Sequence, residues 1–125
     1  MTTINCVNEI RSEVGEGPNW DASTSTISWV DIAGKLWFEQ NIDGGPVTTH
    51  SVPEVIGAIV GRKKGGYYAA TKEGFAELNP DNGWKITKNF LKEDERMNDA
   101  KVDSAGRFWA GSCTMDMVPG TGALY

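Results

Sequence analysis

A repeat with a period of roughly 40 residues constrains the fold of this chain more than any other feature. Three units can be aligned, and each contains three short apolar or aromatic segments. The segments are Pro18–Trp20, Ile27–Val30 and Lys35–Phe38 in the first unit, Ala58–Val60, Gly66–Ala69 and Gly74–Leu78 in the second, and Ala100–Val102, Arg107–Ala110 and Gly122–Tyr125 in the third. Turn residues separate the last two segments of each unit, at Ala33–Gly34, Lys72–Gly74 and Pro119–Gly122. Each unit is therefore predicted to be an antiparallel meander.

Meanders repeated at this interval predict a β-propeller, an all-β fold whose sheets pack face to face around a central channel. The chain would supply about the first two to three blades, so we expect residues 1–125 to form one partial propeller domain. Tyr125 falls within the last predicted strand, and the domain is therefore expected to be truncated at its C-terminus. Blade faces and edges left exposed in this way could support self-association.

Composition narrows the class of protein further. The 15 Gly and five Trp favour closely spaced strands and tight turns over helices. Lys92–Glu95 could add a short helical turn, but a solvated charged loop is the favoured interpretation. The net charge of -5 argues against nucleic acid as a partner. The run Gly61–Gly66 lacks the spacing of a phosphate-binding loop and is predicted to be a charged hairpin turn.

The termini and the cysteines bear on the compartment. Met1–Cys6 lacks the basic start and apolar core of a signal peptide, and no apolar run is long enough to span a bilayer, so no membrane association is expected. Cys6 and Cys113 do not form a disulfide framework by their spacing. Reduced thiols and a cytoplasmic location are therefore expected.

Residues Arg96–Gly111 place a polar cluster directly ahead of a turn and an aromatic strand. Asn98 and Asp99 lie where the chain would enter the strand unit, and Asp103–Gly106 supplies turn residues. Arg107–Ala110 alternates as a half-buried strand does. This arrangement is typical of side chains presented at the mouth of a strand.

The same run resembles the signature of the SMP-30/gluconolactonase/luciferin-regenerating enzyme family, R-x-N-D-x-K-x-D-x-x-G-R-x-W-x-G. Gly15–Asp21 resembles the family's G-E-G-P-x-W segment, and Ile27–Asp31 and Gly122–Tyr125 resemble the strands that follow the two motifs. The resemblance therefore covers nearly the whole chain. Members of the family are six-bladed propellers about twice this length or more, so the chain would be the N-terminal portion of one.

The resemblance implies metal-dependent hydrolysis of a sugar (aldono-) lactone at the mouth of the channel. Glu16 corresponds to a metal ligand, and one divalent ion of calcium, zinc, manganese or iron would suit a carboxylate. Arg96 and Asn98 would bind the hydroxyls or ring oxygen of the lactone. Asp116 stands where some relatives have a substrate-contacting Glu. The family's other metal ligands, an Asn and an Asp, and the Asp that could act as general base come from later blades and have no counterpart here.

Each of these residues also has a structural interpretation. Glu16 could be a solvated turn carboxylate, Arg96 part of the charged loop, and Asn98 the cap of a turn. Asp99 and Asp103 are expected to be structural, because Asp at strand entries and turns commonly accepts hydrogen bonds from nearby backbone N–H groups.

Two further residue types have structural predictions. His50 lies in a polar, hairpin-like stretch after Gly44–Pro46 and is not expected to be a base or ligand. The tryptophans are expected to fill the space between blades. Those concerned are Trp20, Trp29, Trp37 and Trp109.

Three functional classes follow from the sequence. The first is a gluconolactonase-like hydrolase, or the N-terminal part of one. The second is a calcium-binding regulatory propeller without significant turnover. The third is an inactive interaction fragment, which would self-associate without binding a metal.

Overall fold

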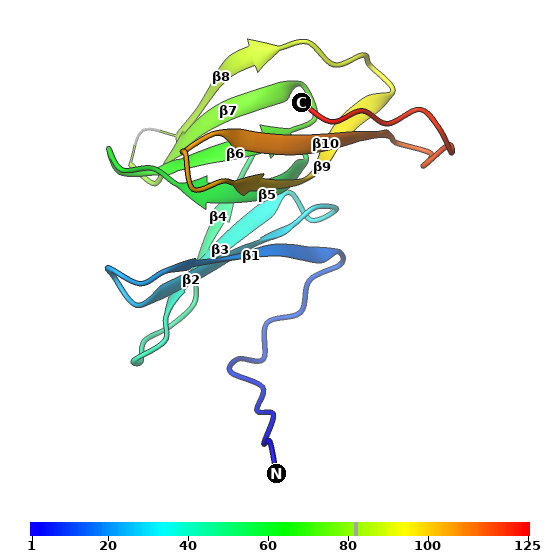
Figure 1. Cartoon of the computed structure of the whole chain (residues 1–125). Helices are drawn as coiled ribbons and strands as arrows, with labels where there is room; N and C mark the ends of the chain where they lie inside the picture. The colour runs from blue at the N-terminus through cyan, green and yellow to red at the C-terminus, as the bar shows by residue number, and fades with distance from the viewer. Residues whose placement is uncertain (82) are drawn as a thin grey trace.

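The computed structural model describes residues 1–81 and 83–125, and this part of the chain contains ten β-strands and no helix (Figure 1). The strands are β1 (Gly15–Asp21), β2 (Thr26–Asp31), β3 (Leu36–Asn41), β4 (Thr48–Ser51), β5 (Ile56–Gly61), β6 (Tyr67–Thr71), β7 (Gly74–Asn79), β8 (Gly83–Asn89), β9 (Glu95–Val102) and β10 (Phe108–Thr114). In the described part there is consequently no helix that is long and apolar enough to cross a membrane.

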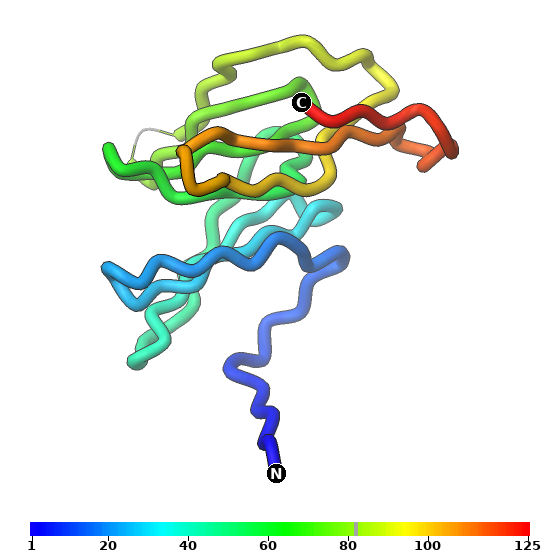
Figure 2. The backbone as a smooth tube through the Cα atoms, viewed as in Figure 1, coloured from blue at the N-terminus to red at the C-terminus, as the bar shows by residue number. Residues whose placement is uncertain are grey.

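The strands form three antiparallel sheets that follow one another along the chain (Figures 1 and 2). Sheet 1 has the order β1-β2-β3-β4, sheet 2 has the order β5-β6-β7-β8, and sheet 3 pairs β9 with β10. The first strands of the sheets, β1, β5 and β9, contact one another. The predicted meanders and the all-β propeller architecture are confirmed: the chain forms two complete blades and the beginning of a third.

Each complete sheet has four strands, whereas the sequence pattern predicted three. The additional strands are the outermost ones, β4 and β8. The sequence of β4, Thr-Thr-His-Ser, is polar and largely exposed, so it lacks the apolar alternation that marks a strand in sequence. In β8, Trp84 and Ile86 alternate with lysines and pack against the apolar layer between sheets 1 and 2, but two apolar residues in a short polar segment are a weak signal.

The segment Gly122–Tyr125 pairs with β10, as predicted, but not as a regular strand. Tyr125 N donates to Ala110 O at 2.9 Å, and Ala110 N donates to Tyr125 O at 3.1 Å. Ala123 N donates instead to the side-chain Oγ of Ser112 at 3.1 Å. The ladder is therefore reduced to an isolated bridge between Gly111 and Leu124.

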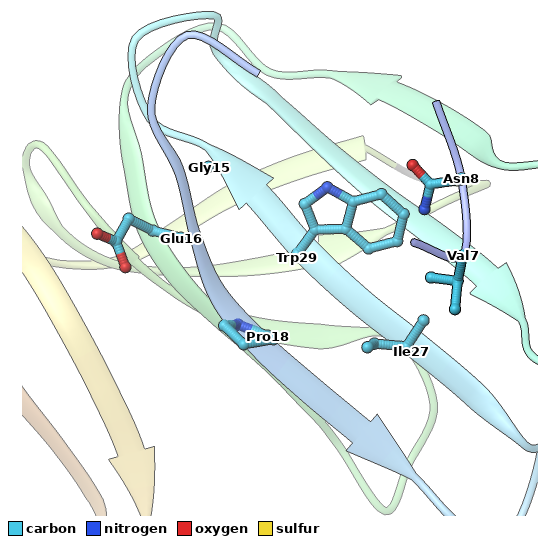
Figure 3. A pocket seen from close by; sticks show the side chains of 7 residues that line it. All are labelled: Val7, Asn8, Gly15, Glu16, Pro18, Ile27 and Trp29. Atoms are coloured by element: carbon cyan, nitrogen blue, oxygen red, sulfur yellow. The ribbon is translucent and has the colours of Figure 1, made fainter. Parts of the chain in front are cut away.

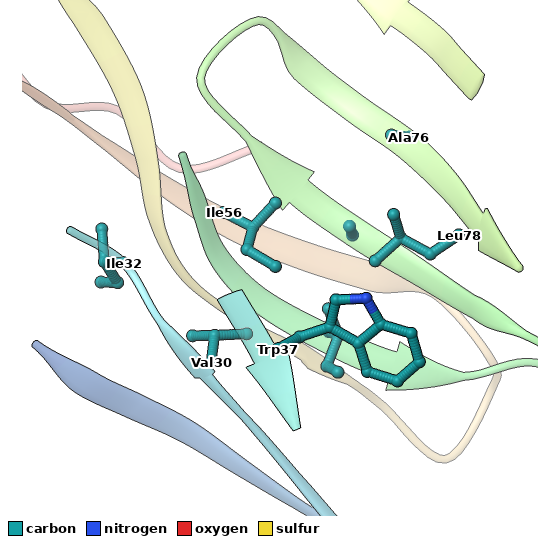
Figure 4. Close-up of a cluster of buried hydrophobic side chains, with 8 residues drawn as sticks. Val30, Ile32, Trp37, Ile56, Ala76 and Leu78 are labelled. Atoms are coloured by element: carbon teal, nitrogen blue, oxygen red, sulfur yellow. The ribbon is translucent and has the colours of Figure 1, made fainter. Parts of the chain in front are cut away.

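Two apolar layers hold the three sheets together. Between sheets 1 and 2 the layer consists of Val30, Ile32, Trp37, Ile56, Ile59, Ala69, Ala76 and Leu78 (Figure 4). Between sheets 2 and 3 it consists of Ala58, Ala70, Met97, Ala100 and Ala110. Successive side chains of a strand point to opposite faces, so β5 contributes to both layers. Sheet 2 is thus buried on both faces, as a blade inside a propeller must be.

Only one of the four tryptophans fills the space between these blades. Trp37 is 3% exposed and packs edge-on against Tyr67 of sheet 2. Trp29 lies on the other face of sheet 1, where its ring stacks on Phe38 at 5.1 Å. Trp20 and Trp109 are 52% and 41% exposed. The prediction is therefore confirmed for Trp37, and for Trp20, Trp29 and Trp109, which do not lie between the described blades, it stays a prediction.

The charged segments form turns and loops. Lys92–Asp94 precedes β9 as a non-helical loop, as favoured from the sequence. Gly61–Gly66 is a hairpin turn, in which Arg62 N donates to Gly66 O at 3.0 Å. His50 lies in β4, which pairs with β3 as an antiparallel hairpin, and its ring stacks on Trp37 at 3.8 Å.

Candidate functional site

The three inner strands share a local irregularity near their starts. In β1 the pairing shifts between Glu16 and Asn19, so that Gly17–Pro18 oppose a single residue of β2. In β5 the unpaired residue is Gly57, and in β9 it is Asn98. A β-bulge of this kind bends the strand and redirects the adjacent side chains, and bulges occur often beside functional sites.

The three bulges lie against one another. A Cβ placed on Gly17 would be 3.4 Å from the Cα of Ala58 and from the carbonyl oxygen of Gly57. A Cβ placed on Gly57 would be only 2.1 Å from the carbonyl oxygen of Asn98. Glu16, which precedes the first bulge, and Asn98, which forms the third, are therefore at the same end of the inner strands with one strand between them.

The Asp31 carboxylate fixes the chain that leads into Glu16. Asp31 accepts hydrogen bonds from the backbone N–H of Glu13 and of Val14, both at 2.9 Å, and from Gly34 at 3.1 Å. Burial acts to raise the pKa of Asp31, but these backbone donors outweigh it and leave the pKa below its ordinary value. Asp31 therefore remains ionised and holds the start of β1 in place.

The Glu16 side chain is exposed and is directed away from Trp29 (Figure 3). A shallow hollow of about 320 Å³ lies beside β1 and is lined by Val7, Asn8, Gly15, Glu16, Pro18, Ile27 and Trp29. Figure 3 shows the Glu16 carboxylate directed away from Val7, Asn8 and Trp29. Glu16 therefore borders this hollow, but its carboxylate points away from the Trp29 side.

Arg96 and Asn98 lie within β9 and not in a segment ahead of a strand, which corrects the sequence prediction. The inner strand is polar there, so its residues resemble a loop in sequence. Arg96 Nη1 donates to Asn98 Oδ1 and to the carbonyl oxygen of Met97, each at 3.0 Å. The Asn98 side chain is exposed, and Arg96 is half-buried.

Asp116 lies in the exposed turn that follows β10. Its neighbour Met117 has a left-handed backbone with φ of 56°, and its sulfur lies 3.9 Å from Arg96 Nη2. Thr114 holds this turn, because its Oγ1 accepts a hydrogen bond from Val118 N at 2.9 Å. The turn that carries Asp116 therefore adjoins Arg96.

Asp103 and Asp99 have the local backbone contacts that were expected of structural residues. Asp103 Oδ2 accepts hydrogen bonds from Trp109 Nε1 at 3.0 Å and Arg107 Nε at 2.7 Å. These donors, with the backbone N–H of Arg107, lower the pKa of Asp103 to about 2. Asp99 Oδ1 accepts a hydrogen bond from Ala100 N at 2.7 Å.

Glu16 is the residue that the family resemblance predicts to be a metal ligand. In positions 1–81 and 83–125, no group of three or more His, Cys, Asp or Glu side chains is placed to hold a metal ion. A single exposed carboxylate is the right kind of ligand for a hard cation, but such ions take six or more oxygen ligands. Glu16 alone therefore does not complete a site for such an ion.

A larger hollow lies toward the other end of the inner strands. It has a volume of about 920 Å³ and is lined by the hairpin Asn19–Thr24, by Ile59–Lys63, by Tyr67, and by Lys101 and Val102 at the end of β9. Pro18–Asp21 of the first motif and Lys101 of the second contribute to its lining, whereas the candidate site residues Glu16, Arg96 and Asn98 do not.

Comparison with known proteins agrees with this architecture. Regucalcin from Danio rerio is 33% identical over 93% of this chain, and 6-deoxy-6-sulfogluconolactonase from Pseudomonas putida is 36% identical over 88% of it. The structure of regucalcin, a calcium-binding protein from Agrobacterium tumefaciens, superposes with a TM-score of 0.88 at 22% identity, over 95% of this chain and 41% of that one.

This chain spans only 40% and 39% of the length of the two relatives matched by sequence. Its fold is therefore that of a partial propeller of the regucalcin and gluconolactonase type. The model of the SMP-30/Gluconolactonase/LRE-like region matches residues 14–125, which is nearly all of the chain. The chain therefore belongs to the SMP-30/gluconolactonase/LRE-like family.

Proposed function

We propose that this chain forms the first blades of a sugar lactonase that opens aldonolactones with the help of one divalent metal ion. The observation that supports this most is the contact of the three inner-strand bulges, from Gly17 through Gly57 to Asn98. This contact brings the two motifs, which are far apart in the sequence, to one end of the sheets. The relatedness to a sulfogluconolactonase supports the substrate class.

In this proposal Arg96, Asn98 and Asp116 bind the substrate. The guanidinium and the amide supply hydrogen-bond donors, which suit the hydroxyls, the ring oxygen and the carbonyl oxygen of a lactone. The Asp116 carboxylate is an acceptor and suits a sugar hydroxyl. Their role is to hold the ring in one orientation, and such positioning contributes a large share of a rate enhancement.

Glu16 is proposed as one ligand of the metal. A carboxylate is a suitable ligand for such an ion, but one carboxylate is too few. The remaining ligands and the general base are therefore assigned to parts of the protein beyond these 125 residues. A bound calcium, zinc, manganese or iron ion would polarise the lactone carbonyl and lower the pKa of a water ligand. The free Cys6 and Cys113 thiols fit the cytoplasmic location that is part of this proposal.

A second function, calcium binding without significant turnover, has specific support. Several relatives carry the name regucalcin, and the Agrobacterium protein is a calcium-binding protein. The two functions make different demands, since binding needs only the ligand set, whereas turnover also needs the substrate contacts of Arg96 and Asn98.

The test uses the protein encoded by the complete reading frame, alongside the 125-residue chain. Hydrolysis of D-glucono-1,5-lactone is followed as acid release at constant pH, with each divalent metal, with chelator, and without protein to give the spontaneous rate. Chelator-sensitive turnover in the complete protein supports the lactonase. Calcium binding without turnover would select the regulatory function, and self-association with neither property would select an interaction fragment.

A further inference from the structure

Gly57 is the middle residue of the contact between the three bulges, and no sequence motif includes it. It is buried in β5, between β1 on one side and β9 on the other. Its position differs from that of Gly61 in the same strand, where an added Cβ would meet nothing within 4 Å. A side chain at position 57 would therefore clash with its surroundings, whereas one at position 61 would not.

Because Gly57 has no side chain, the backbone of Asn98 in β9 can approach β5 closely. With any side chain at position 57, the Cβ would be 2.1 Å from the Asn98 carbonyl oxygen and 2.8 Å from that of Met97. Contacts of this kind are not observed below 3.0 Å, so β5 and β9 would have to separate by about an ångström. The backbone of Asn98 is thus seated directly on Gly57.

The side chain of Asn98 is held from a second direction. Arg96 Nη1 donates to Asn98 Oδ1 at 3.0 Å, and a guanidinium has only donors to offer, so the amide oxygen must face it. The Nδ2 group of Asn98 is then turned away from Arg96. Because the Asn98 side chain is exposed, its two N–H groups are available to a ligand.

We infer that Gly57 is a positioning residue that, together with Arg96, fixes Asn98 as a hydrogen-bond donor toward an oxygen-rich ligand such as the lactone ring. This rests on the proposed function and adds to it a residue from the middle blade. Gly57 sets where Asn98 stands between β5 and β9, and Arg96 sets which end of the amide is presented. The Asn98 amide nitrogen therefore donates hydrogen bonds to the oxygen atoms of a ligand.

The test is made in the protein encoded by the complete reading frame. Gly57→Ala is expected to raise the KM for D-glucono-1,5-lactone by about tenfold or more, since an ångström of misplacement suffices for such losses. Gly61→Ala is the matched control in the same strand and should leave KM unchanged. Asn98→Asp, which still accepts from Arg96 but cannot donate, should lose as much as Asn98→Ala.

A purely structural role for Gly57 is separated by a double-mutant cycle. If Gly57 acts through Asn98, Gly57→Ala should change KM by less than about twofold once Asn98 is Ala. An undiminished effect in that background, or a KM of Gly57→Ala equal to that of Gly61→Ala, would overturn the inference. Lactone turnover equal to the parent in Asn98→Asp would overturn the donor assignment.

Failure of the proposed function is distinguished by a measurement that needs no turnover. The side-chain amide signals of Asn98 in the nitrogen–proton NMR spectrum should move in Gly57→Ala and in Arg96→Lys, and stay in place in Gly61→Ala. Absence of lactone turnover in the parent protein would reject the lactonase alone. Unchanged Asn98 signals in Gly57→Ala would reject the positioning role, whether or not the protein is a lactonase.

Discussion

The phenolic hydroxyl of Tyr67 in β6 donates a 2.5 Å hydrogen bond to Oε1 of Glu39 in β3, and this bond joins sheet 2 to sheet 1. The other carboxylate oxygen, Glu39 Oε2, lies 3.0 Å from His50 Nε2. The His50 ring in turn stacks on Trp37, which belongs to the apolar layer between the same sheets. A polar network therefore adjoins the first blade interface and restricts how the two blades can slide.

Removal of the Tyr67 hydroxyl should loosen this interface. Tyr67→Phe is expected to lower the free energy of unfolding by about 1.5 to 3 kcal/mol, because a hydrogen bond to a charged, half-buried acceptor is lost. Tyr68→Phe is the matched control. Its hydroxyl bonds a neutral partner, Thr87 Oγ1 at 2.9 Å, so a loss of about 0.5 to 1.5 kcal/mol is expected. Urea unfolding at neutral pH measures both, and equal losses would contradict the special role of Glu39.

The same contact predicts behaviour in alkali. Burial, and then the hydrogen bond and negative charge of Glu39, raise the pKa of Tyr67 above its ordinary 10.0. A raised pKa favours the neutral phenol in the fold, so this stabilisation is complete below about pH 10 and is lost as the pH rises further. The stability gap between the parent and Tyr67→Phe should be constant up to about pH 10 and narrow above it. If the stability difference between the parent and Tyr67→Phe instead widened above about pH 10, the pKa of Tyr67 would be lowered in the fold and not raised.

Asp103 predicts the corresponding behaviour in acid. Hydrogen bonds from Trp109 and Arg107 lower its pKa from 3.8 to about 2. A lowered pKa favours the carboxylate in the fold, so its contribution is present above about pH 4 and is lost as the pH falls toward about 2. Asp103→Asn should therefore unfold at lower urea concentration than the parent at neutral pH and approach it in acid. A carboxyl NMR titration of Asp103 with a midpoint near 3.8 would contradict the assignment.

The strands with alternating apolar residues were predicted from the sequence, and the strands with few apolar residues were missed. Ile27–Val30 and Gly74–Leu78 were recognised because their buried and half-buried positions alternate across a sheet. The edge strand β4 has no apolar residue, and β8 has only Trp84 and Ile86, so their hydrophobic patterns distinguish them poorly from loops. The order of the meander was predictable, whereas the width of each blade was not.

The motif residues of the candidate site could be predicted from the sequence, but their arrangement in space could not. Glu16, Arg96 and Asn98 stand out as motif residues, but Gly57 does not, because its importance comes from a carbonyl oxygen on a strand about 40 residues away. The polar inner strand β9 also resembles a loop in sequence, since its Arg-Met-Asn-Asp run breaks the apolar alternation. Contacts of this kind depend on how blades pack, which a local pattern does not contain.

Trp37 and Trp20 give a prediction about blade packing. Trp37 is buried between sheets 1 and 2, and Trp37→Ala should cost about 3 to 5 kcal/mol through lost burial and a cavity. Trp20 is 52% exposed, so Trp20→Ala should change stability by only about 0.5 kcal/mol. Thermal unfolding of both variants measures the difference. Comparable destabilisation would mean that the first blade interface does not depend on Trp37.

The last prediction concerns the metal, and Glu16 and Glu13 provide a matched pair. Both side chains are exposed and lie three positions apart, but only Glu16 directly precedes the first bulge and belongs to the family motif. Glu16→Gln should weaken binding of calcium or another divalent ion by about tenfold or more, because a charged oxygen ligand is replaced by a neutral one. Glu13→Gln should leave the affinity unchanged, and titration calorimetry on the protein encoded by the complete reading frame measures both.

The same titration separates ligand binding from metal binding. Asn98→Ala should retain the metal affinity of the parent while lactone turnover falls, because Asn98 is proposed to position the ring and not to hold the ion. The isolated 125-residue chain should bind the ion weakly, since a single carboxylate cannot offset the dehydration of a divalent cation. Equal metal affinity in the 125-residue chain and in the complete protein would show that Glu16 and its described neighbours form the whole site, and that later blades add nothing to it.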